Sequence, residues 1–476
     1  MIASAALSDT MRSEMKRIIS NIELAKSDTN AKNRAASLPN LYNITLVFTS
    51  KINPMVNVKL SREVKTVTIE QDYVNNITDK ITAELEISVN TFEILQQFRS
   101  ELFCELSFTP SDFTHGPIKQ FTPVFCRQFR AVLLNTQDIY KSISGRKLRP
   151  KDYNKTAEVT DVAHLTLPLK LELIDDTVYS ARHDRIHGVF GEVNMINMLR
   201  HIVSDFGIPK AAIKMPDNSY FYTNLVIPPD FGIADIMGFM QNGPGMGVYN
   251  NGFCSYITDG TWYIYPRYGE GWSKRVVQLY SLGKDTIAGL NKFDWKEVLS
   301  DESDWVTHIL LNSDVVENNW SLLGVENTPN AANIQSADLL IDGTRKWIKD
   351  DTFHMRPVAS PTVFVPSDVM SAEKSINMTF KTSQANDFTI TSELCATQAS
   401  TLAFRWEACS PFTFTPGTEV KFNYDHPGGY KSVSCKCEQV TYKFIQSTTH
   451  NLYPVFGGVA DVVLVYNNFD ALVGET

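Results

Sequence analysis

Apolar and polar residues alternate with a period of two in the first part of the chain. The clearest run places Ile81, Ala83, Leu85, Ile87 and Val89 between Thr82, Glu84, Glu86 and Ser88. This period puts the apolar side chains on one face of a strand and the polar side chains on the other. Similar runs at 42–48, 103–108, 129–134 and 163–173 predict an antiparallel barrel or sandwich over residues 38–180, with one short helix inserted near residues 90–98. Pro168, on the opposite face of its run from the leucines, predicts an edge or a bulge there.

The period of two returns after residue 361. Val433, Cys435 and Cys437 occupy odd positions, whereas Val440, Tyr442 and Phe444 occupy even ones. Because side chains alternate strictly along a strand, the change of parity predicts one inserted residue, a β-bulge, near Glu438 and Gln439. With the apolar run at 459–466, this pattern predicts a second β-barrel or sandwich over residues 361–476.

Residues 181–285 between these two parts show helical spacing. Val193, Ile196, Leu199 and Val203 predict a helix that ends at Gly207, and a second helix is expected to start at Pro228–Asp230. An extended run at 224–227 and strands at 248–249 and 262–266 complete a compact α/β unit.

Two further segments are less regular. Met11, Met15, Ile18 and Ile22 form a narrow apolar stripe, which predicts an N-terminal amphipathic helix with a linker, residues 1–37. That helix packs either on its own domain or on another subunit. Residues 286–360 are mixed and polar, and we expect short helices and loops there. The predicted fold class is therefore β-rich α+β: two antiparallel β-barrel (tube-like) domains flanking an α/β middle domain, with an N-terminal helix.

Composition narrows the possible partners. The chain has 476 residues and a net charge of −9, without the clustered basic face that gripping nucleic acid by its phosphates requires. No apolar run approaches the roughly 18 residues that span a bilayer, so no membrane insertion is expected. Seven cysteines, an odd number, favour reduced thiols and synthesis in a cytoplasm.

Three patterns are candidate ligand sites. Cys435 and Cys437 could contribute two thiolates to a metal, but positions i and i+2 share the face of Val433, which favours buried free cysteines. His183 and His187 have the four-residue spacing of a helical metal pair, yet Gly188 follows at once. Gly243–Gly247 is glycine-rich, but it follows a helix and leads into a strand, which favours a helix-ending turn over a phosphate loop.

Acid–base and stacking sites were the remaining candidates. Asp175, Asp176 and the segment Lys349–Asp351 carry carboxylates that solvated turns explain. An aromatic set could stack on sugars or bases, or pack across a hairpin: Tyr220, Tyr222, Tyr249, Tyr256, Trp262, Tyr263, Tyr265, Tyr268 and Trp272. The sequence nominates no catalytic, cofactor-binding or metal residue and predicts no cofactor and no enzyme activity.

The order of these parts resembles the baseplate hub proteins of phage tails and the related spike proteins of type VI secretion systems. The residues that carry the resemblance are the helix at 193–203 closed by Asp205–Ile208, then Tyr222–Pro229, Gly247–Asn250, Trp262–Tyr268 and the Thr415–Thr418 turn. It covers roughly residues 38–285 and 410–470.

This resemblance implies a structural virion protein. It implies a homotrimer whose paired barrels join a sixfold tail tube to a threefold central spike, with other baseplate proteins as neighbours. It also implies that DNA passes through the lumen without specific binding, and that the protein resides in the tail baseplate. Two alternatives stay open: a baseplate wedge or tail-tip adaptor, and a virion-associated cell-wall or polysaccharide hydrolase.

Overall fold

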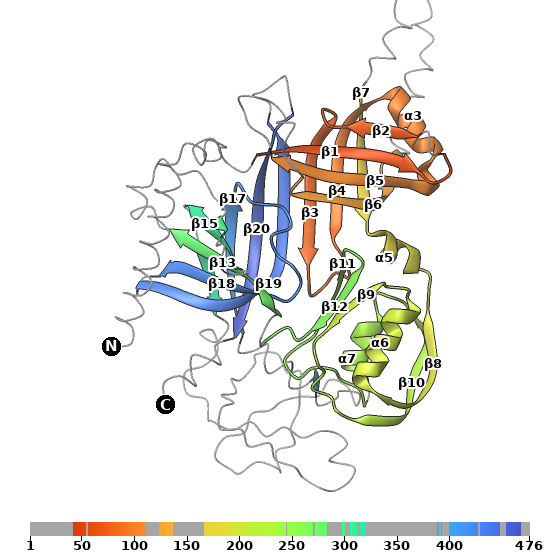
Figure 1. Ribbon diagram of the computed structural model, residues 1–476, viewed down its shortest axis with the longest axis vertical. Coiled ribbons are helices and arrows are strands. Elements are labelled where there is room, and N and C mark those ends of the chain that lie inside the picture. The colour runs from red at the N-terminus through yellow and green to blue at the C-terminus, as the bar shows by residue number, and fades with distance from the viewer. Residues whose placement is uncertain are drawn as a thin grey trace, which may run out of the picture.

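Strands dominate the computed structural model (Figure 1). It describes residues 41–53, 56–110, 123–136, 166–243, 245–269, 272–282, 298–299, 305–311, 315–319, 388–389, 392, 399–426, 429–447 and 454–467. The expected N-terminal helix and linker, residues 1–37, and the segment Lys349–Asp351 lie outside these ranges.

The first lobe comprises the strands that precede residue 175. They are β1 (Leu41–Ser50), β2 (Asn57–Leu60), β3 (Val64–Asp72), β4 (Lys80–Ser88), β5 (Leu102–Pro110), β6 (Phe125–Leu133) and β7 (Thr166–Ile174). The inserted helix is α3 (Val89–Gln97), followed by the short 3-10 helix η1 (Arg99–Glu101). The Ser88 hydroxyl caps α3 by accepting a hydrogen bond from the Thr91 N–H at 3.2 Å.

Pro168 lies where β7 passes the end of β6. It pairs with Glu86 of β4 on one side, whereas β6 reaches only Leu171 on the other. The Asn135 side chain takes the place of a strand there, donating to the Pro168 carbonyl oxygen and accepting from the Lys170 N–H, both at 2.9 Å. The predicted local edge is therefore confirmed.

Two long strands near the C-terminus are shared by both lobes. They are β19 (Gly429–Gln446) and β20 (Phe456–Asn467), which pair with each other. In the first lobe, strand pairings run β19-β3-β4-β7-β6-β5-β1-β20 and return to β19, so eight strands form a closed ring. Figure 1 shows β19 and β20 standing between the two lobes.

The second lobe lies on the other side of the shared strands. It contains β13 (Trp272–Leu282), β14 (Val298–Leu299), β15 (Trp305–Leu311), β16 (Val315–Asn319), β17 (Ala399–Glu407) and β18 (Thr418–His426). The strands within the predicted second domain, residues 361–476, pair antiparallel, whereas β13, which comes from outside that range, pairs in parallel with both β15 and β18. β13 follows the middle unit in the sequence, and its two neighbours in the sheet, β15 and β18, come later in the chain. Short helices were expected over residues 286–360, but the described residues there are β14, β15 and β16, whose β-branched and aromatic side chains suit strands.

The predicted bulge is confirmed. Cys437 faces Leu464 of β20 and Gln439 faces Val463, so Glu438 is the extra residue. β19 changes its second neighbour at the same point, pairing with β18 up to Lys436 and with β3 from Gln439 onwards. The bulge is thus the place where one strand passes from one lobe to the other.

The middle unit, residues 186–265, folds around its own core. Its elements are β8 (Ile186–Asn194), α6 (Met195–Asp205), β9 (Lys210–Ile213), β10 (Phe221–Phe231), α7 (Ile236–Asn242), β11 (Cys254–Thr258) and β12 (Thr261–Tyr265). The short helix α5 (Asp176–Ala181) connects it to β7. β8 and β10 form a two-stranded ribbon, and β11, β12 and β9 form a second small sheet.

Two local expectations for the middle unit are wrong. The second helix does not start at Pro228–Asp230, because both prolines continue β10 and α7 begins only at Ile236. Val248 and Tyr249 do not form a strand. The side-chain amide of Gln241 bonds both of their N–H groups and the Tyr249 carbonyl oxygen, at 2.9–3.1 Å, and thereby replaces a partner strand.

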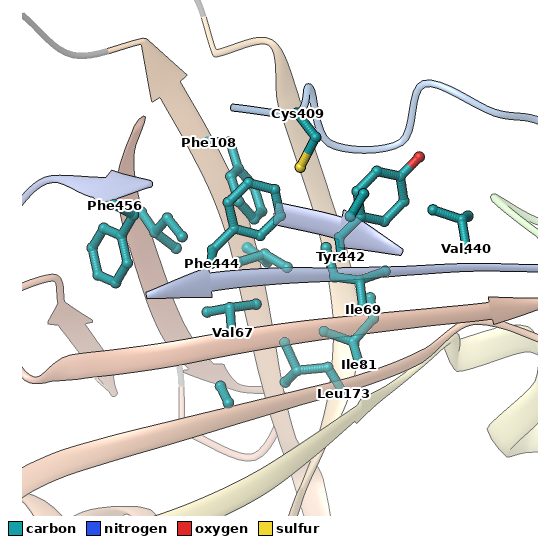
Figure 2. Packing of buried hydrophobic residues seen from close by; sticks show 14 of the residues in the cluster. Val67, Ile69, Ile81, Phe108, Leu173, Cys409, Val440, Tyr442, Phe444 and Phe456 are labelled. Atoms are coloured by element: carbon teal, nitrogen blue, oxygen red, sulfur yellow. The ribbon is translucent and has the colours of Figure 1, made fainter. Parts of the chain in front are cut away.

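One apolar core fills the strand framework formed by the two lobes and the shared strands. Figure 2 shows Val67 and Ile69 of β3, Ile81 of β4, Leu173 of β7, Phe108 of β5 and Tyr442 and Phe444 of β19 packed together, all of them buried. The rings of Phe108 and Phe444 meet edge to face with centroids 4.8 Å apart. Apart from Val67 and Ile69, whose strand the sequence analysis did not predict, these residues occupy alternating apolar positions that the sequence pattern identified.

Gly458 of β20 offers a test of this packing. A Cβ atom there would collide with the Phe444 ring and lie 3.0 Å from the Cys409 sulfur, whereas a Cβ on Gly457 would meet nothing within 4 Å. We expect Gly458→Ala to lower the free energy of unfolding by about 1–3 kcal/mol, because overpacking displaces the ring. Gly457→Ala serves as the control and should leave stability within about 1 kcal/mol of wild type in the same denaturant titration.

Candidate functional site

The cysteines considered as metal ligands are buried thiols. Cys435 and Cys437 form no disulfide and lie within β19, and burial raises the pKa of the Cys437 thiol well above its usual range. His183 lies in the turn after α5 and His187 lies in β8, both exposed, so they do not share a helix. In the described ranges, no group of three or more His, Cys, Asp or Glu side chains is arranged to hold a metal ion.

The glycine run ends a helix. The Gly243 N–H donates to the Phe239 carbonyl oxygen at 2.7 Å, and the Gly247 N–H donates to that of Met240 at 3.0 Å. These N–H groups are therefore engaged with α7, as the helix-ending interpretation predicts.

Most of the aromatic set is packed inside the molecule. Tyr249, Tyr256, Trp262, Tyr265 and Tyr268 are buried, whereas Tyr220 is exposed. Tyr256 faces Tyr263 across the β11–β12 hairpin, and Trp262 faces Ile257. Cross-strand packing therefore accounts for the hairpin aromatics.

Asp175 corrects a sequence prediction. It was expected in a solvated turn, but it is buried. Its carboxylate caps α5 by accepting from the Thr177 N–H at 3.0 Å, and it also accepts from Arg127 at 3.1 Å. The turn is buried because the guanidinium of β6 lies against it. The neighbouring Asp176 remains partly exposed, 3.5 Å from the Arg130 Nε.

A buried polar network, which we call the Arg127 junction, joins the first lobe to the middle unit. Its centre is Asp79, just before β4, whose side chain is 3% exposed. The Asp79 carboxylate accepts hydrogen bonds from the Gln71 amide at 2.7 Å and from the Tyr256 and Thr258 hydroxyls at 2.8 Å each. Tyr256 and Thr258 belong to β11, so one carboxylate of the lobe holds two residues of the hairpin.

Arg127 supplies the positive charge of this junction. Its guanidinium lies 3.5 Å from Asp79, 3.1 Å from Asp175 and 3.3 Å from Asp259, and it donates to the Thr258 hydroxyl at 3.1 Å. It therefore touches carboxylates from the lobe, from the entry to α5 and from the hairpin turn. These ion pairs, together with the hydrogen bonds to Asp175 and Thr258, hold the hairpin turn against the lobe.

The tyrosines of the junction are hydrogen-bond donors. Burial, followed by weaker effects of neighbouring groups that include Asp79, raises the pKa of Tyr73 well above its usual range. Burial and the Asp79 carboxylate do the same for the pKa of Tyr256. Their rings meet edge to face at 4.8 Å, and the Tyr73 hydroxyl donates to the Phe414 carbonyl oxygen at 3.1 Å. Both hydroxyls therefore keep their protons at neutral pH and act as fixed donors.

Sequence reasoning missed Arg127 and Asp79, although a signal was present. Arg127 lies in the same alternation as Phe125, Phe129 and Ala131, on the face that points to the core. Gln71 likewise continues the buried series Val67 and Ile69. A charged or amide side chain in an apolar register indicates a buried polar network, because such groups must find partners when water is excluded.

A second contact holds the middle unit to the shared strands. Arg267, just after β12, forms an ion pair with Glu438 at the bulge. The buried Lys436 donates to the Pro266 carbonyl oxygen at 2.7 Å. Burial lowers the pKa of Lys436 to about 8, with the neighbouring Cys254 opposing the shift. The bulge residue thus faces the exit of the middle unit.

The outward face of β3, β4 and β7 is charged and internally paired; we call it the charged face. Lys65 lies 3.3 Å from Glu86, Lys80 lies 3.1 Å from Glu70, and Lys170 lies 3.7 Å from Glu84. Each pair bridges neighbouring strands. Single exposed pairs add little stability, but together they leave this face without a basic stripe that would hold a polyanion.

The polar contacts of the described residues hold segments of the backbone in place. The polar atoms around Asp79 are bonded to one another, so the junction fixes the hairpin against the lobe. None of the helices in the described ranges is long and apolar enough to cross a bilayer.

Comparison with known proteins adds structural neighbours. No protein-family model matches the sequence, and no curated protein matches it. The chain is similar to a tail protein from Neisseria meningitidis MC58, at 9% identity over 90% of this chain and 98% of that chain, with a TM-score of 0.44. It is also similar to the 43 kDa tail protein of prophage MuSo2 from Shewanella oneidensis, at 9% identity over 89% of this chain and 99% of that chain, with a TM-score of 0.39.

A third similar structure is a chain of the lidded PdpA–VgrG complex of Francisella. The identity is 11% over 96% of this chain and 59% of that chain, with a TM-score of 0.40. The structural neighbours are thus phage tail proteins and proteins related to type VI secretion spikes, the classes that the sequence resemblance indicated.

The Arg127 junction can be tested with two aspartates that contact the same guanidinium. Asp79→Ala leaves Arg127 and three donors without their buried acceptor, and we expect the free energy of unfolding to fall by about 3–5 kcal/mol. Asp259 is 78% exposed, and Asp259→Asn should cost no more than about 1 kcal/mol. Denaturant titration of both variants measures the difference, and equal losses would contradict a buried centre at Asp79.

Lys436 predicts a specific pH dependence. Below about pH 8 the folded protein holds a buried ammonium, whereas the unfolded chain keeps its lysine protonated up to the ordinary pKa of 10.5. Between these values the unfolded state binds more protons, so the Lys436 contribution to stability rises with pH. We expect Lys436→Met to be more stable than wild type by about 1–2 kcal/mol at pH 7, with the gain shrinking towards pH 10.5. Lys443→Met, at an exposed site on the same strand, should show no such trend.

Proposed function

We propose that this protein is a structural hub of a phage tail baseplate, which joins the sixfold tail tube to the threefold central spike and lines the DNA exit channel. The observation that carries the proposal is that two β lobes stand side by side on the same pair of strands, β19 and β20. In this proposal each lobe acts as one tube-like barrel. Three copies then offer six β units to a sixfold tube while keeping threefold symmetry for a spike.

Free strand edges support assembly into such a ring. In the described part of the chain, β16 pairs with β17 alone, β14 with β15 alone and β2 with β1 alone. An exposed edge presents unpaired N–H and C=O groups that can accept a strand from another subunit. The second lobe therefore ends in edges suited to joining a neighbouring copy.

The charged face supports the channel part of the proposal. Its lysines are paired with glutamates across strands, and the whole chain carries a net charge of −9. A lumen lined in this way repels or ignores phosphates, so DNA slides past without being held. We propose that β3, β4 and β7 turn this face towards the channel.

Copy number in the particle tests the role. In an image of the assembled tail, we expect three copies of this chain on the tail axis, between the tube and the spike. Six or twelve copies away from the axis would instead identify a wedge or adaptor. Cleavage of peptidoglycan or capsule by the purified protein, lost on changing one Asp or Glu, would identify a hydrolase.

Edge association predicts the effect of a charge on β16. Val316 lies on this edge strand and is 54% exposed. We expect Val316→Lys to shift the purified protein from trimer to monomer, because lysine on an edge opposes strand addition. Light scattering after size exclusion gives the mass, three times 53.6 kDa for the trimer.

Ile445→Lys is the matched control for this edge variant. Ile445 is 50% exposed but lies on β19, which is paired on both sides by β3 and β20. Its substitution should leave the trimer intact. Equal dissociation of both variants, or of neither, would contradict assembly through the β16 edge.

A further inference from the structure

The middle unit has a core of its own. Every buried residue of that core lies between Val178 and Ile264, a contiguous stretch of sequence. The core of the strand framework is a separate cluster, and Tyr256 is the residue of the middle unit that joins it. A contiguous segment with its own core meets the requirements for an independently folded body.

Polar contacts hold this body to the framework, together with two apolar contacts: Ile77 packs against the middle-unit core, and the Tyr256 ring meets Tyr73 edge to face. The Arg127 junction fixes the β11–β12 hairpin to the first lobe, and the contacts of Arg267 with Glu438 and of Lys436 with Pro266 fix its exit to β19. One backbone hydrogen bond also crosses the boundary, from the Ile257 N–H to the Ile77 carbonyl oxygen at 2.7 Å. Polar groups regain hydrogen bonds from water on separation, so such a boundary opens at a smaller cost than an apolar core of the same area.

The covalent connections also permit movement. Among the described residues, the chain passes between the framework and the middle unit just before α5, whose Val178 and Ala181 belong to the middle-unit core, and at Pro266–Gly269. Thr389 contacts α7 from a third segment, donating to the Gln241 carbonyl oxygen at 3.3 Å. Figure 1 shows the middle unit beside the framework, attached along the hairpin side.

We propose that the middle unit undocks from the strand framework as a rigid body, with the Arg127 junction as the latch. Opening breaks the hydrogen bonds of Asp79 to Tyr256 and Thr258 and that of Ile257 to Ile77. Opening also withdraws the Tyr256 ring from the framework core, whereas the other buried residues of both cores stay packed. All of these contacts lie within one chain, so the proposed undocking does not depend on the hub function.

Hydrogen exchange at the Ile257 amide tests the latch, because this N–H is protected by the framework and not by its own hairpin partner. Asp79→Asn keeps the shape of the side chain but replaces one acceptor oxygen by an NH2 group. This group can only donate, and it would face the groups that now donate to Asp79. We expect exchange at Ile257 at least tenfold faster than in wild type, with exchange in β4 and α6 unchanged. Asp259→Asn, at the exposed carboxylate beside the same guanidinium, should leave exchange at Ile257 unchanged.

Two outcomes would overturn the proposal. Faster exchange in β4 or α6 together with Ile257 would mean that the molecule loosens as a whole. Unchanged exchange at Ile257 would mean that the junction does not control docking. If Asp79→Asn does not fold, Thr258→Val provides the same test, because it removes one donor to Asp79 at equal size.

Discussion

The hydrogen-bonded ladder between β19 and β20 is the contact on which the rest of the framework depends. A strand has two edges, and each of these strands gives one edge to the other over ten matched residue pairs. With its remaining edge, β19 pairs first with β18 and then with β3, while β20 pairs with β1 and with β17. Both lobes are therefore extensions of one ladder, and their relative placement follows from backbone pairing.

The middle unit is attached by a different kind of force. Its hairpin meets the framework through side-chain hydrogen bonds and ion pairs centred on Asp79 and Arg127. A paired ladder tolerates little relative motion, because each shift breaks many bonds in register. A small set of polar contacts defines one docked position and still allows separation. The molecule thus combines a rigid frame with one part that is held by specific contacts.

Much of this fold could be predicted from the sequence, because most framework strands have one buried face and one solvent-exposed face. β1, β4, β5 and β7 follow the alternation of apolar and polar residues, and the parity change at Glu438 located the bulge. The parallel pairing of β13 could not be predicted, because alternation does not specify which strand lies alongside. At Val248 and Tyr249 the side chain of Gln241 replaced a partner strand, which no local pattern reveals. The Arg127 junction was not predicted for a related reason, because its residues come together only through tertiary structure. The position of Arg127 in an apolar register nevertheless indicated a buried polar contact.

Glu438 carries a further consequence for how this protein tolerates change. The bulge sets which side chains of the following residues point inwards: Val440, Tyr442 and Phe444 are buried, whereas Thr441, Lys443 and Ile445 point outwards. A lineage that lost this single codon would exchange the two sets, pushing a lysine into the interior and three large apolar groups into water. Insertions and deletions are therefore tolerated at some places in the chain and not at others. Surface turns can grow or shrink, but the spacing between Cys437 and Gln439 is bound to its present length.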